Sequence, residues 1–302
     1  MIDLSKMVTE TRNRKTMNLD EMTPLELISI MNEEDGKVIA AVRTELPKIA
    51  QVVEWCTESL GGTGRLIYMG AGTSGRLGLL DAVECPPTFG VKPDKVIGLI
   101  AGGNNAFVKA VEGAEDSETL GAEDLKNIHL MPEDVVIGMA ASGRTPYVIS
   151  GLRYARKIGC KTAAIVCNEN SVMAKEVEIT IELIAGPEVL TGSTRLKAGT
   201  AEKMVCNMIS TASMVGIGKA YQNLMVDVVQ TNTKLMKRAE NIVIQATGCN
   251  RKEAQDALKN ADGHAKTAIV SILSNCRAEE AREKLAKARG HVRYAIKQTT
   301  KK

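Results

Sequence analysis

Short apolar runs that alternate with helical patterns constrain the fold of this chain more than any other feature. Four of the runs are apolar throughout, as is typical of strands buried on both faces of a sheet. The fifth alternates apolar and polar residues over 177–182, which suits an exposed edge strand. Strands that alternate with helices are joined by right-handed crossovers and build a parallel sheet. The expected strands cover residues 65–69, 96–100, 135–140, 162–166 and 178–184.

The sequence therefore predicts an α/β fold: a five-stranded parallel sheet with helices on both faces, followed by a small all-helical domain. Residues 23–60 are predicted to form one helix, with Thr23 as its cap and Pro24 in its first turn. The run 198–216 carries too little charge for a solvated helix, so it is expected to pack on the sheet or to form a subunit interface. The expected domains are an N-terminal helical segment (1–53), a sheet domain (54–217) and a C-terminal helical region (218–302), with helices at 251–260, 264–273, 278–288 and 291–297.

Composition and charge argue against two classes of binding partner, nucleic acids and membranes. The chain has 302 residues, of which 44% are hydrophobic and 25% charged, as in ordinary globular proteins. A net charge of +3 with only 3% aromatic residues argues against nucleic-acid binding, which needs a basic stripe with aromatic residues. No apolar run approaches the ~20 residues of a membrane span, and the N-terminus is polar, so a cytoplasmic protein without a membrane partner is expected.

The seven cysteines and three histidines do not indicate a metal site or a disulfide framework. No cysteine pair has C-x-x-C spacing, and most lie in apolar stretches, so reduced core thiols are expected. His129, His264 and His291 lie far apart and lack zinc-binding spacing. His264 lies at the start of an expected helix. Its role there is that of a helix cap, of a surface residue or of a group that reaches a second subunit. The sequence predicts neither a metal nor another cofactor.

A glycine-rich turn follows the first strand. Residues 70–75, GAGTSG, match the dinucleotide fingerprint G-x-G-x-x-G. However, the second strand ends without the acidic residue that holds a ribose, and no lysine follows Gly75 as a P-loop requires. The sequence therefore argues against a dinucleotide site and against a P-loop. A helix that begins here still presents free N–H groups and the positive end of its dipole, which favour a different phosphate-bearing ligand.

Hydroxyl groups beside glycine recur at three expected strand ends. Any one of these turns, taken alone, is better explained as a helix N-cap, because serine and threonine are preferred at that position. Three of them at equivalent ends of one parallel sheet favour a site for a phosphomonoester, which hydroxyl and N–H groups can surround without a metal. The turns comprise residues 73–75, 141–145 and 191–197.

Three longer segments resemble the signatures of the N-acetylmuramic acid 6-phosphate etherases, bacterial members of the sugar isomerase (SIS) superfamily. They are GAGTSGRLGLLDAVECPPTFG (70–90), AGGNNAFVKAVEGAEDS (101–117) and GPEVLTGSTRLKAGTAEKMVCNMIST (186–211). The likeness runs from Thr9 to about residue 298. The resemblance implies an SIS fold for residues 54–217. It also implies a lyase that splits N-acetylmuramic acid 6-phosphate into D-lactate and N-acetylglucosamine 6-phosphate.

The resemblance also implies the catalytic residues. It assigns proton donation to the leaving lactyl oxygen to Glu84, and it makes Glu115 the partner base. Elimination followed by water addition needs two carboxyl groups at one substrate, one of them protonated near neutral pH, and no metal or redox cofactor. Two prolines, 86 and 87, are expected to end the preceding helix beside Glu84, where apolar neighbours remove it from water. Nearby acids are Asp81, Glu112, Asp116 and Glu118, and spacing alone does not exclude Glu112 or Asp116.

The substrate phosphate is expected to contact the first two turns, and the third turn supplies further contacts. Glu188 either holds a sugar hydroxyl or orders its own loop. Arg76 and Arg144 either add charge or are solvated residues at helix starts. The expected contacts are the hydroxyls of Thr73, Ser74, Ser142 and Thr145, the N–H groups of Gly75 and Gly143, and the side chains of Ser193, Thr194 and Lys197.

The resemblance implies a homodimer as well. A single SIS domain is similar to half of the two-domain isomerases, so two copies recreate the double arrangement with sites near the interface. Two other functions stay open: a non-catalytic regulator that binds sugar phosphates, as the glucokinase regulatory protein does, and an aldose–ketose isomerase of phosphosugars. The regulatory proteins are about twice as long, and segment 186–211 argues against the isomerase.

Overall fold

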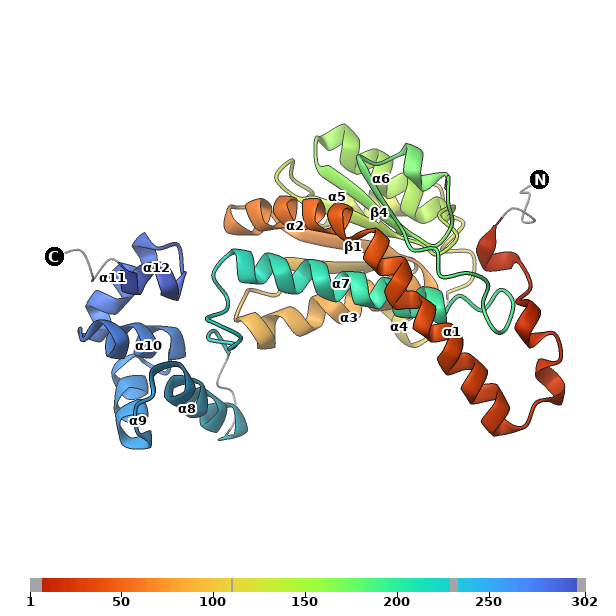
Figure 1. Cartoon of the computed structure of the whole chain (residues 1–302). Coiled ribbons are helices and arrows are strands. Elements are labelled where there is room, and N and C mark those ends of the chain that lie inside the picture. Colours follow the sequence, from red (N-terminus) through yellow and green to blue (C-terminus); the bar gives the residue numbers. More distant parts are fainter. Residues whose placement is uncertain (1–6, 110, 229–232, 298–302) are drawn as a thin grey trace. The chain divides into compact units, whose positions relative to one another are not determined.

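The computed structural model describes residues 7–109, 111–228 and 233–297, and its contacts divide the chain into two compact units (Figure 1). The first unit comprises the residues up to Val83 together with Pro93–Ser210, and the second comprises Glu84–Lys92 and the residues from Thr211 onward. Two long helices, α3 (Gly72–Phe89) and α7 (Lys197–Gly216), each contribute residues to both units. Among the described residues, no helix has the length and apolar character needed to cross a membrane.

The first unit is built on the predicted five-stranded parallel sheet. Its strand order is β2-β1-β3-β4-β5, and all neighbouring strands pair in parallel. Every residue of β1 and β3 is buried, whereas β5 at the edge alternates buried and half-buried residues, as its sequence predicts. The expected strands are confirmed to within two residues at each end. They are β1 (Leu66–Gly70), β2 (Val96–Ile100), β3 (Val135–Met139), β4 (Lys161–Val166) and β5 (Ile179–Glu182).

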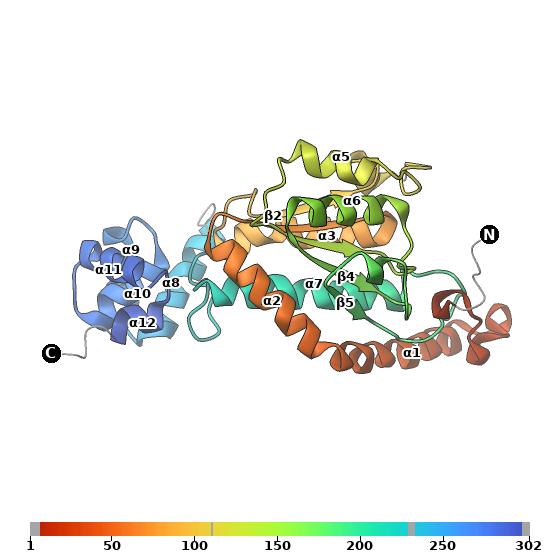
Figure 2. The ribbon, with the colours of Figure 1, turned by 90° about the horizontal axis from the view of Figure 1, so that it is seen from above.

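Different helices cover the two faces of the sheet (Figure 2). Successive residues of a strand point to opposite faces, so Tyr68 and Met69 identify the helices on each. The Tyr68 hydroxyl donates to the carbonyl of Cys206 in α7 at 3.2 Å, whereas Met69 packs against Gly151 of α6. Helix α7 therefore packs on the sheet, which is the first of its two expected roles. The other helices of this unit are α1 (Pro24–Thr44), α2 (Leu46–Gly61), α4 (Asn105–Val108), α5 (Leu120–Asn127) and α6 (Pro146–Ile158), with 3₁₀ helices at Val8–Glu10, Arg14–Thr16, Leu19–Glu21 and Met173–Lys175.

The helix predicted over 23–60 is in fact two helices, α1 and α2, which are separated at Glu45. The break follows from Pro47, which has no N–H to donate and whose ring excludes the carbonyl four residues earlier. Thr23 caps α1 as predicted, in a capping box with Glu26.

The prediction that Pro86 and Pro87 end a helix beside Glu84 is wrong. Helix α3 continues through both prolines to Phe89. It can do so because the fixed φ of proline is itself helical, and only two carbonyls near the end of the helix lose their partners. The helix ends at Gly90, whose φ of +61° is a left-handed conformation that favours glycine.

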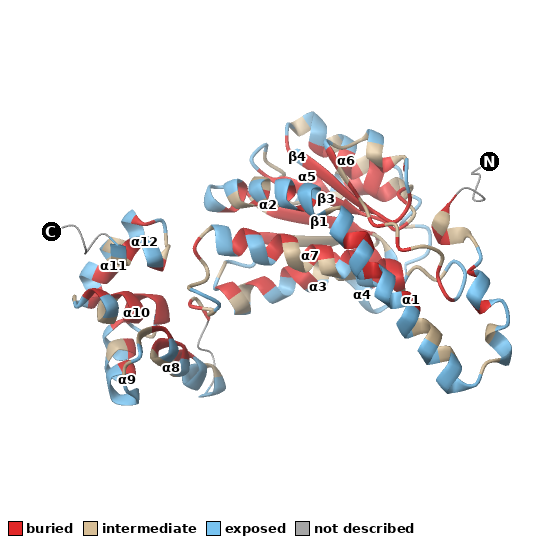
Figure 3. Cartoon of the chain, viewed as in Figure 1, coloured by how far each residue is buried: buried red, intermediate tan, exposed pale blue. Residues whose placement is uncertain are grey.

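The second unit is a small helical domain. The apolar faces of its helices pack around α10, in which Ala268, Ile269 and Val270 are fully buried (Figure 3). Asn250 caps α9 in a capping box with Glu253. The four helices predicted beyond residue 250 are confirmed to within one residue at each end, and one more helix precedes them. The helices are α8 (Thr233–Thr247), α9 (Arg251–Asn260), α10 (Ala265–Ser274), α11 (Ala278–Lys287) and α12 (Val292–Lys297).

Candidate functional site

The carboxyl ends of β1 and β3 form the place where a sheet of this strand order binds ligands. The strand order reverses between β1 and β3, and the crevice at such a reversal is the usual ligand site of parallel sheets. The last residues of the two strands, Gly70 and Met139, are register partners. The first two hydroxyl-bearing turns therefore begin side by side.

The glycines of the first turn allow its tight closure. A Cβ atom on Gly70 would lie 2.6 Å from the nitrogen of Gly75, and one on Gly75 would lie 2.7 Å from the carbonyl oxygen of Gly70. The N–H of Gly75 donates to the carbonyl of Ala71 at 3.1 Å, so this N–H is engaged within the turn and does not offer the predicted phosphate contact. The N–H groups of Thr73 and Ser74 precede this first helical bond, and they are the groups that a helix start presents to an anion.

Ser74 makes a contact that the sequence does not predict. Its hydroxyl donates to Oε1 of Glu202 in α7 at 2.9 Å, and both side chains are buried. Burial raises the pKa of Glu202 to about 8, and the hydrogen bond from Ser74 opposes this shift only in part. A signal for Glu202 was present in the sequence, because it is the single acid in the apolar run 198–216.

The second turn depends on Gly143. This residue has a φ of +65°, and a Cβ atom on it would lie 2.3 Å from Cβ of Ser171. Its N–H donates to the carbonyl of residue 140 at 2.8 Å, so this predicted phosphate donor is also engaged within its turn. Ser142 Oγ accepts the N–H of Arg144 at 3.3 Å. Thr145 is the N-cap residue of α6, but its side chain makes no capping bond, which argues against a purely capping role for this hydroxyl.

The third turn lies against the first. Gly199, in the first turn of α7, is so close that a Cβ atom on it would lie 3.2 Å from Cγ2 of Thr73. Within the turn, Ser193 and Thr194 are half-buried, and the Thr194 carbonyl accepts the N–H of Gly199 at 2.9 Å. The structure thus gathers all three hydroxyl-bearing turns at one edge of the sheet.

Glu188 and Lys197 hold the third turn in place. The carboxylate of Glu188 accepts the N–H groups of Lys197 at 3.0 Å and Ala198 at 2.9 Å, at the start of α7. Burial raises the pKa of Glu188, and these N–H bonds oppose the shift. The Nζ of Lys197 donates to Oε2 of Glu34 at 2.7 Å and to the carbonyl of Ala185 at 3.2 Å. Of the two roles expected for Glu188, its contacts support the ordering of its own loop.

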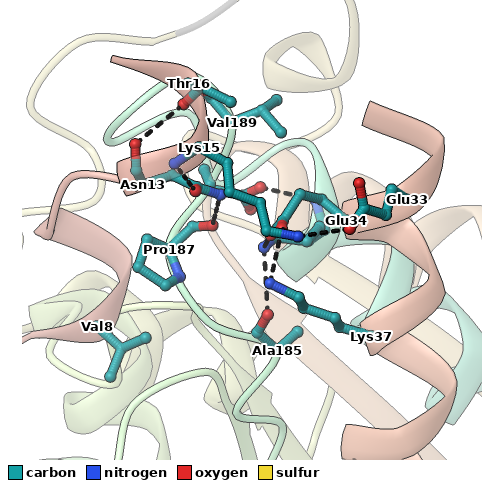
Figure 4. Close-up of polar contacts among 12 residues, drawn as sticks. Val8, Asn13, Lys15, Thr16, Glu33, Glu34, Lys37, Ala185, Pro187 and Val189 are labelled. Carbon is teal, nitrogen blue, oxygen red and sulfur yellow. Dashed lines mark hydrogen bonds and ion pairs between the residues drawn. The ribbon is translucent and has the colours of Figure 1, made fainter. Parts of the chain in front are cut away.

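The N-terminal segment joins the same network (Figure 4). Nδ2 of Asn13 donates to the carbonyl of Pro187 at 3.3 Å, and the hydroxyl of Thr16 donates to the carbonyl of Val189 at 2.8 Å. The segment that precedes α1 therefore packs on the loop that leads from β5 to the third turn. These contacts place residues 13–16 beside the third turn, although the two segments lie more than 170 residues apart in the sequence.

Glu115 lines a pocket of about 180 Å³ beside the first turn. Gly72, the first residue of α3, lines the same pocket, and so does Glu112, one of the acids that spacing leaves open. The main chain of Glu115 is anchored to α6, because the N–H of Tyr147 donates to the Glu115 carbonyl at 3.1 Å. The structure therefore brings Glu115, together with Glu112, to the first hydroxyl-bearing turn.

Arg76 supports this pocket from α3. Its guanidinium donates to the carbonyls of residues 106 and 107, both at 2.8 Å, and so fixes the segment of α4 that lines the pocket. These bonds give Arg76 a structural role in addition to its charge. Within the described ranges, no cluster of three or more His, Cys, Asp or Glu side chains is arranged to hold a metal ion.

Glu84 is placed differently from Glu115. It is exposed on α3, and its neighbour Val83 is 57% exposed, so the apolar residues around Glu84 do not enclose it as expected. Ten residues of continuous helix lead from Ser74 to Glu84, which corresponds to about three turns or ~15 Å. The structure does not bring Glu84 to the first turn of its own helix.

Comparison with known proteins identifies the relatives of the chain. The model for the glucokinase regulatory protein N-terminal SIS domain matches residues 48–156, and the SIS domain model matches residues 111–212. An N-acetylmuramic acid 6-phosphate etherase of Geobacillus sp. is 60% identical over 270 residues, which cover 89% of this chain and 92% of the relative. Proteins of the same name from Mycolicibacterium smegmatis (58% over 271 residues, 90% and 91% covered) and Pectobacterium atrosepticum (58% over 274 residues, 91% and 90% covered) are equally similar.

Among solved structures, a phosphoheptose isomerase from Neisseria gonorrhoeae is similar with a TM-score of 0.49 and 13% identity, covering 65% of this chain and 98% of that one. This likeness is too distant to bear on function. The matches to the etherases extend over nine-tenths of the chain and confirm the resemblance of the three sequence segments. The chain belongs to the N-acetylmuramic acid 6-phosphate etherase family.

Proposed function

We propose that this chain cleaves the D-lactyl ether at C3 of N-acetylmuramic acid 6-phosphate and releases D-lactate and N-acetylglucosamine 6-phosphate. The observation that carries the proposal is 58–60% identity to the etherases named above over about nine-tenths of the chain. The enzyme is then a carbon–oxygen lyase of amino sugar catabolism. We place it in the cytoplasm, where the thiols of its seven cysteines stay reduced.

The substrate phosphate binds at the reversal point of the sheet in this proposal. The N–H groups at the start of α3 and the hydroxyls of Ser74 and Thr145 donate to its oxygens, with Thr73 and Ser142 beside them. Support comes from the strand register that sets the first two turns side by side and from the contact between Gly199 and Thr73. The third turn contributes the hydroxyls of Ser193 and Thr194, while Glu188 and Lys197 keep it in position.

The chemistry is an elimination followed by addition of water. In the ring-opened sugar, the C2 proton lies next to the aldehyde, so Glu115 can remove it as a base. The electron pair of the C2–H bond forms a C2–C3 double bond, the C3–O bond breaks, and Glu84 protonates the departing lactyl oxygen. Water then adds at C3 and a proton returns to C2, which regenerates both carboxyl groups.

A second copy of the chain completes the site in this proposal. Glu84 lies about three helical turns beyond Ser74, so a sugar whose phosphate is held at Ser74 does not also reach Glu84 of the same helix. Glu84 is exposed, which leaves it free to enter the pocket of a partner subunit. A homodimer in which each chain lends Glu84 to the other satisfies the need for two carboxyl groups at one substrate.

One finding favours a second candidate function. The match of residues 48–156 to the SIS domain of the glucokinase regulatory protein is compatible with a regulator that binds sugar phosphates without turnover. Incubation of the purified protein with N-acetylmuramic acid 6-phosphate, with D-lactate measured enzymatically, separates the candidates. We expect D-lactate and N-acetylglucosamine 6-phosphate in equal amounts. Tight binding without lactate supports the regulator, and a ketose product without lactate supports an isomerase.

A further inference from the structure

Glu202 is a buried acid that the mechanism proposed above does not use. It lies in the second turn of α7, and only 1% of its surface is exposed. Among the described residues, its carboxyl group has one hydrogen-bond partner, Ser74, whose hydroxyl donates to Oε1 at 2.9 Å. No cation of the described residues offsets the burial of Glu202, so its ionised form is disfavoured and its pKa rises to about 8.

The groups that face Glu202 are uncharged near neutral pH. From α3 comes the hydroxyl of Ser74, from the end of β4 the thiol of Cys167, and from the next turn of α7 the thiol of Cys206. Burial raises the pKa of both thiols well above the ordinary value, and the charge of Glu202 raises it further. The negative charge of Asp81 also raises the pKa of Cys206. Because burial raises the pKa of Glu202 to about 8, this carboxyl changes its protonation state at mildly alkaline pH.

We propose that Glu202 positions Ser74 for phosphate binding, by donating a hydrogen bond as a neutral acid to the Ser74 oxygen. A serine hydroxyl has one donor and two acceptor sites. While Ser74 donates to Glu202, it has no hydrogen left for a phosphate. When Glu202 is protonated and donates to Oγ of Ser74, the Ser74 O–H turns to the phosphate. The inference rests on the phosphate role proposed for Ser74.

Charge supports the same arrangement. An ionised Glu202, one hydroxyl away from a phosphate dianion, would repel it across a buried space, whereas the neutral acid does not. The sign of the pH dependence follows. Affinity is full at pH values below the pKa of Glu202, and it falls as the pH rises above that pKa, by up to tenfold per pH unit for one proton.

The test is the dissociation constant of N-acetylglucosamine 6-phosphate between pH 6.5 and 9.5, measured by titration calorimetry. For the wild-type protein we expect the dissociation constant to rise above pH 8. In Glu202→Gln, the amide N–H donates to Ser74 at every pH, so the alkaline rise should disappear while affinity at pH 7 stays within about threefold. The matched control is Glu123→Gln, an exposed glutamate on α5, which should keep the wild-type profile.

A second measurement needs no variant and so does not depend on how Glu202→Gln folds. At pH 8.5 the phosphate is already a dianion, and about three-quarters of the free protein has an ionised Glu202. Binding to the wild-type protein should therefore take up as much as about three-quarters of a proton per site, read from heats in two buffers of different ionisation enthalpy. A flat wild-type profile, an absence of proton uptake, or an alkaline rise that persists in Glu202→Gln overturns the inference. Lactate release at pH 7 distinguishes these outcomes from a failure of the proposed function, because it does not require the pH dependence.

Discussion

Lys197 and Glu34 form a buried ion pair in which Nζ lies 2.7 Å from Oε2 and the side chains are 2% and 0% exposed. The pair joins the first residue of α7 to the middle of α1, although the two residues are 163 positions apart. Because Lys197 is the last residue of the third hydroxyl-bearing turn, the ion pair connects the stability of the N-terminal helix to the geometry of the site.

Replacing Lys197 by Met should destabilise the fold strongly. The change leaves the carboxylate of Glu34 buried without its one buried partner in the described chain, with only the half-exposed Lys37 and Lys15 beside it. Loss of a buried partner costs about 3–5 kcal/mol. Urea unfolding at pH 7 measures the difference in the free energy of unfolding. The matched control is Lys48→Met, which removes the solvent-exposed partner of Glu45 and should cost no more than about 1 kcal/mol. Equal effects of the two variants would show that burial does not strengthen the dependence on this pair.

Stability should fall in acid because of Glu34. Burial alone would raise the pKa of Glu34, but hydrogen bonds from Lys197 and Lys37 outweigh it and lower the pKa from 4.5 to about 2. A depressed pKa means that the stabilising contribution is complete above pH 4.5 and is lost as the pH falls toward 2. Unfolding curves at pH 5, 4 and 3 should show this loss in the wild-type protein and a smaller slope in Glu34→Gln. The same slope in both proteins would contradict the assignment.

Mixed dimers should test whether Glu84 acts across subunits. Glu84→Gln and Glu115→Gln should each release almost no lactate while still binding N-acetylglucosamine 6-phosphate. If the two glutamates of one site come from different chains, random reassembly of the two variants gives one intact site in half of the dimers, so about a quarter of wild-type activity should return. Unchanged inactivity after proven subunit exchange would place both glutamates of a site in one chain. Normal turnover by Glu84→Gln alone would remove it from the mechanism.

Ser74→Ala should weaken substrate binding more than it slows the chemistry. Loss of a hydrogen bond to a charged phosphate costs about 1–3 kcal/mol. The Michaelis constant for N-acetylmuramic acid 6-phosphate should therefore rise by roughly five- to 150-fold, with a smaller change in turnover. Ser29→Ala, at an exposed position on α1, is the control. An unchanged Michaelis constant would exclude Ser74 as a phosphate ligand.

Gly143→Ala should disrupt the second turn. The new Cβ would lie 2.3 Å from Cβ of Ser171, and the residue would keep a φ of +65°, so either the turn shifts or the protein loses stability. We expect weaker substrate binding and a lower melting temperature. Gly36→Ala is the opposite case, because that glycine lies within α1 and nothing stands within 4 Å of the added Cβ. It should stabilise the fold by about 0.5–1 kcal/mol, and a similar gain from Gly143→Ala would refute the steric argument.

The order of strands and helices along the chain follows from the sequence alone. Apolar runs of five or six residues, the capping box at Thr23 and the helix pattern at 251–260 are local features, and local features determine where an element begins and ends. The same holds for the three hydroxyl-bearing turns, because each lies after a strand, before or at the start of the helix that follows it. Their meeting at one edge could also be predicted, since parallel strands all end at the same side of a sheet.

Only the tertiary structure determines which polar groups are engaged. Lys197 reaches Glu34 across 163 residues and Ser74 reaches Glu202 across 128, and no periodicity relates such positions. The continuation of α3 through two prolines, and with it the distance of Glu84 from Ser74, depends on packing that offsets the cost of the lost helical bonds. A sequence pattern specifies where hydrogen-bonding groups stand along the chain, but their partners and their protonation follow from burial, which is a property of the whole fold.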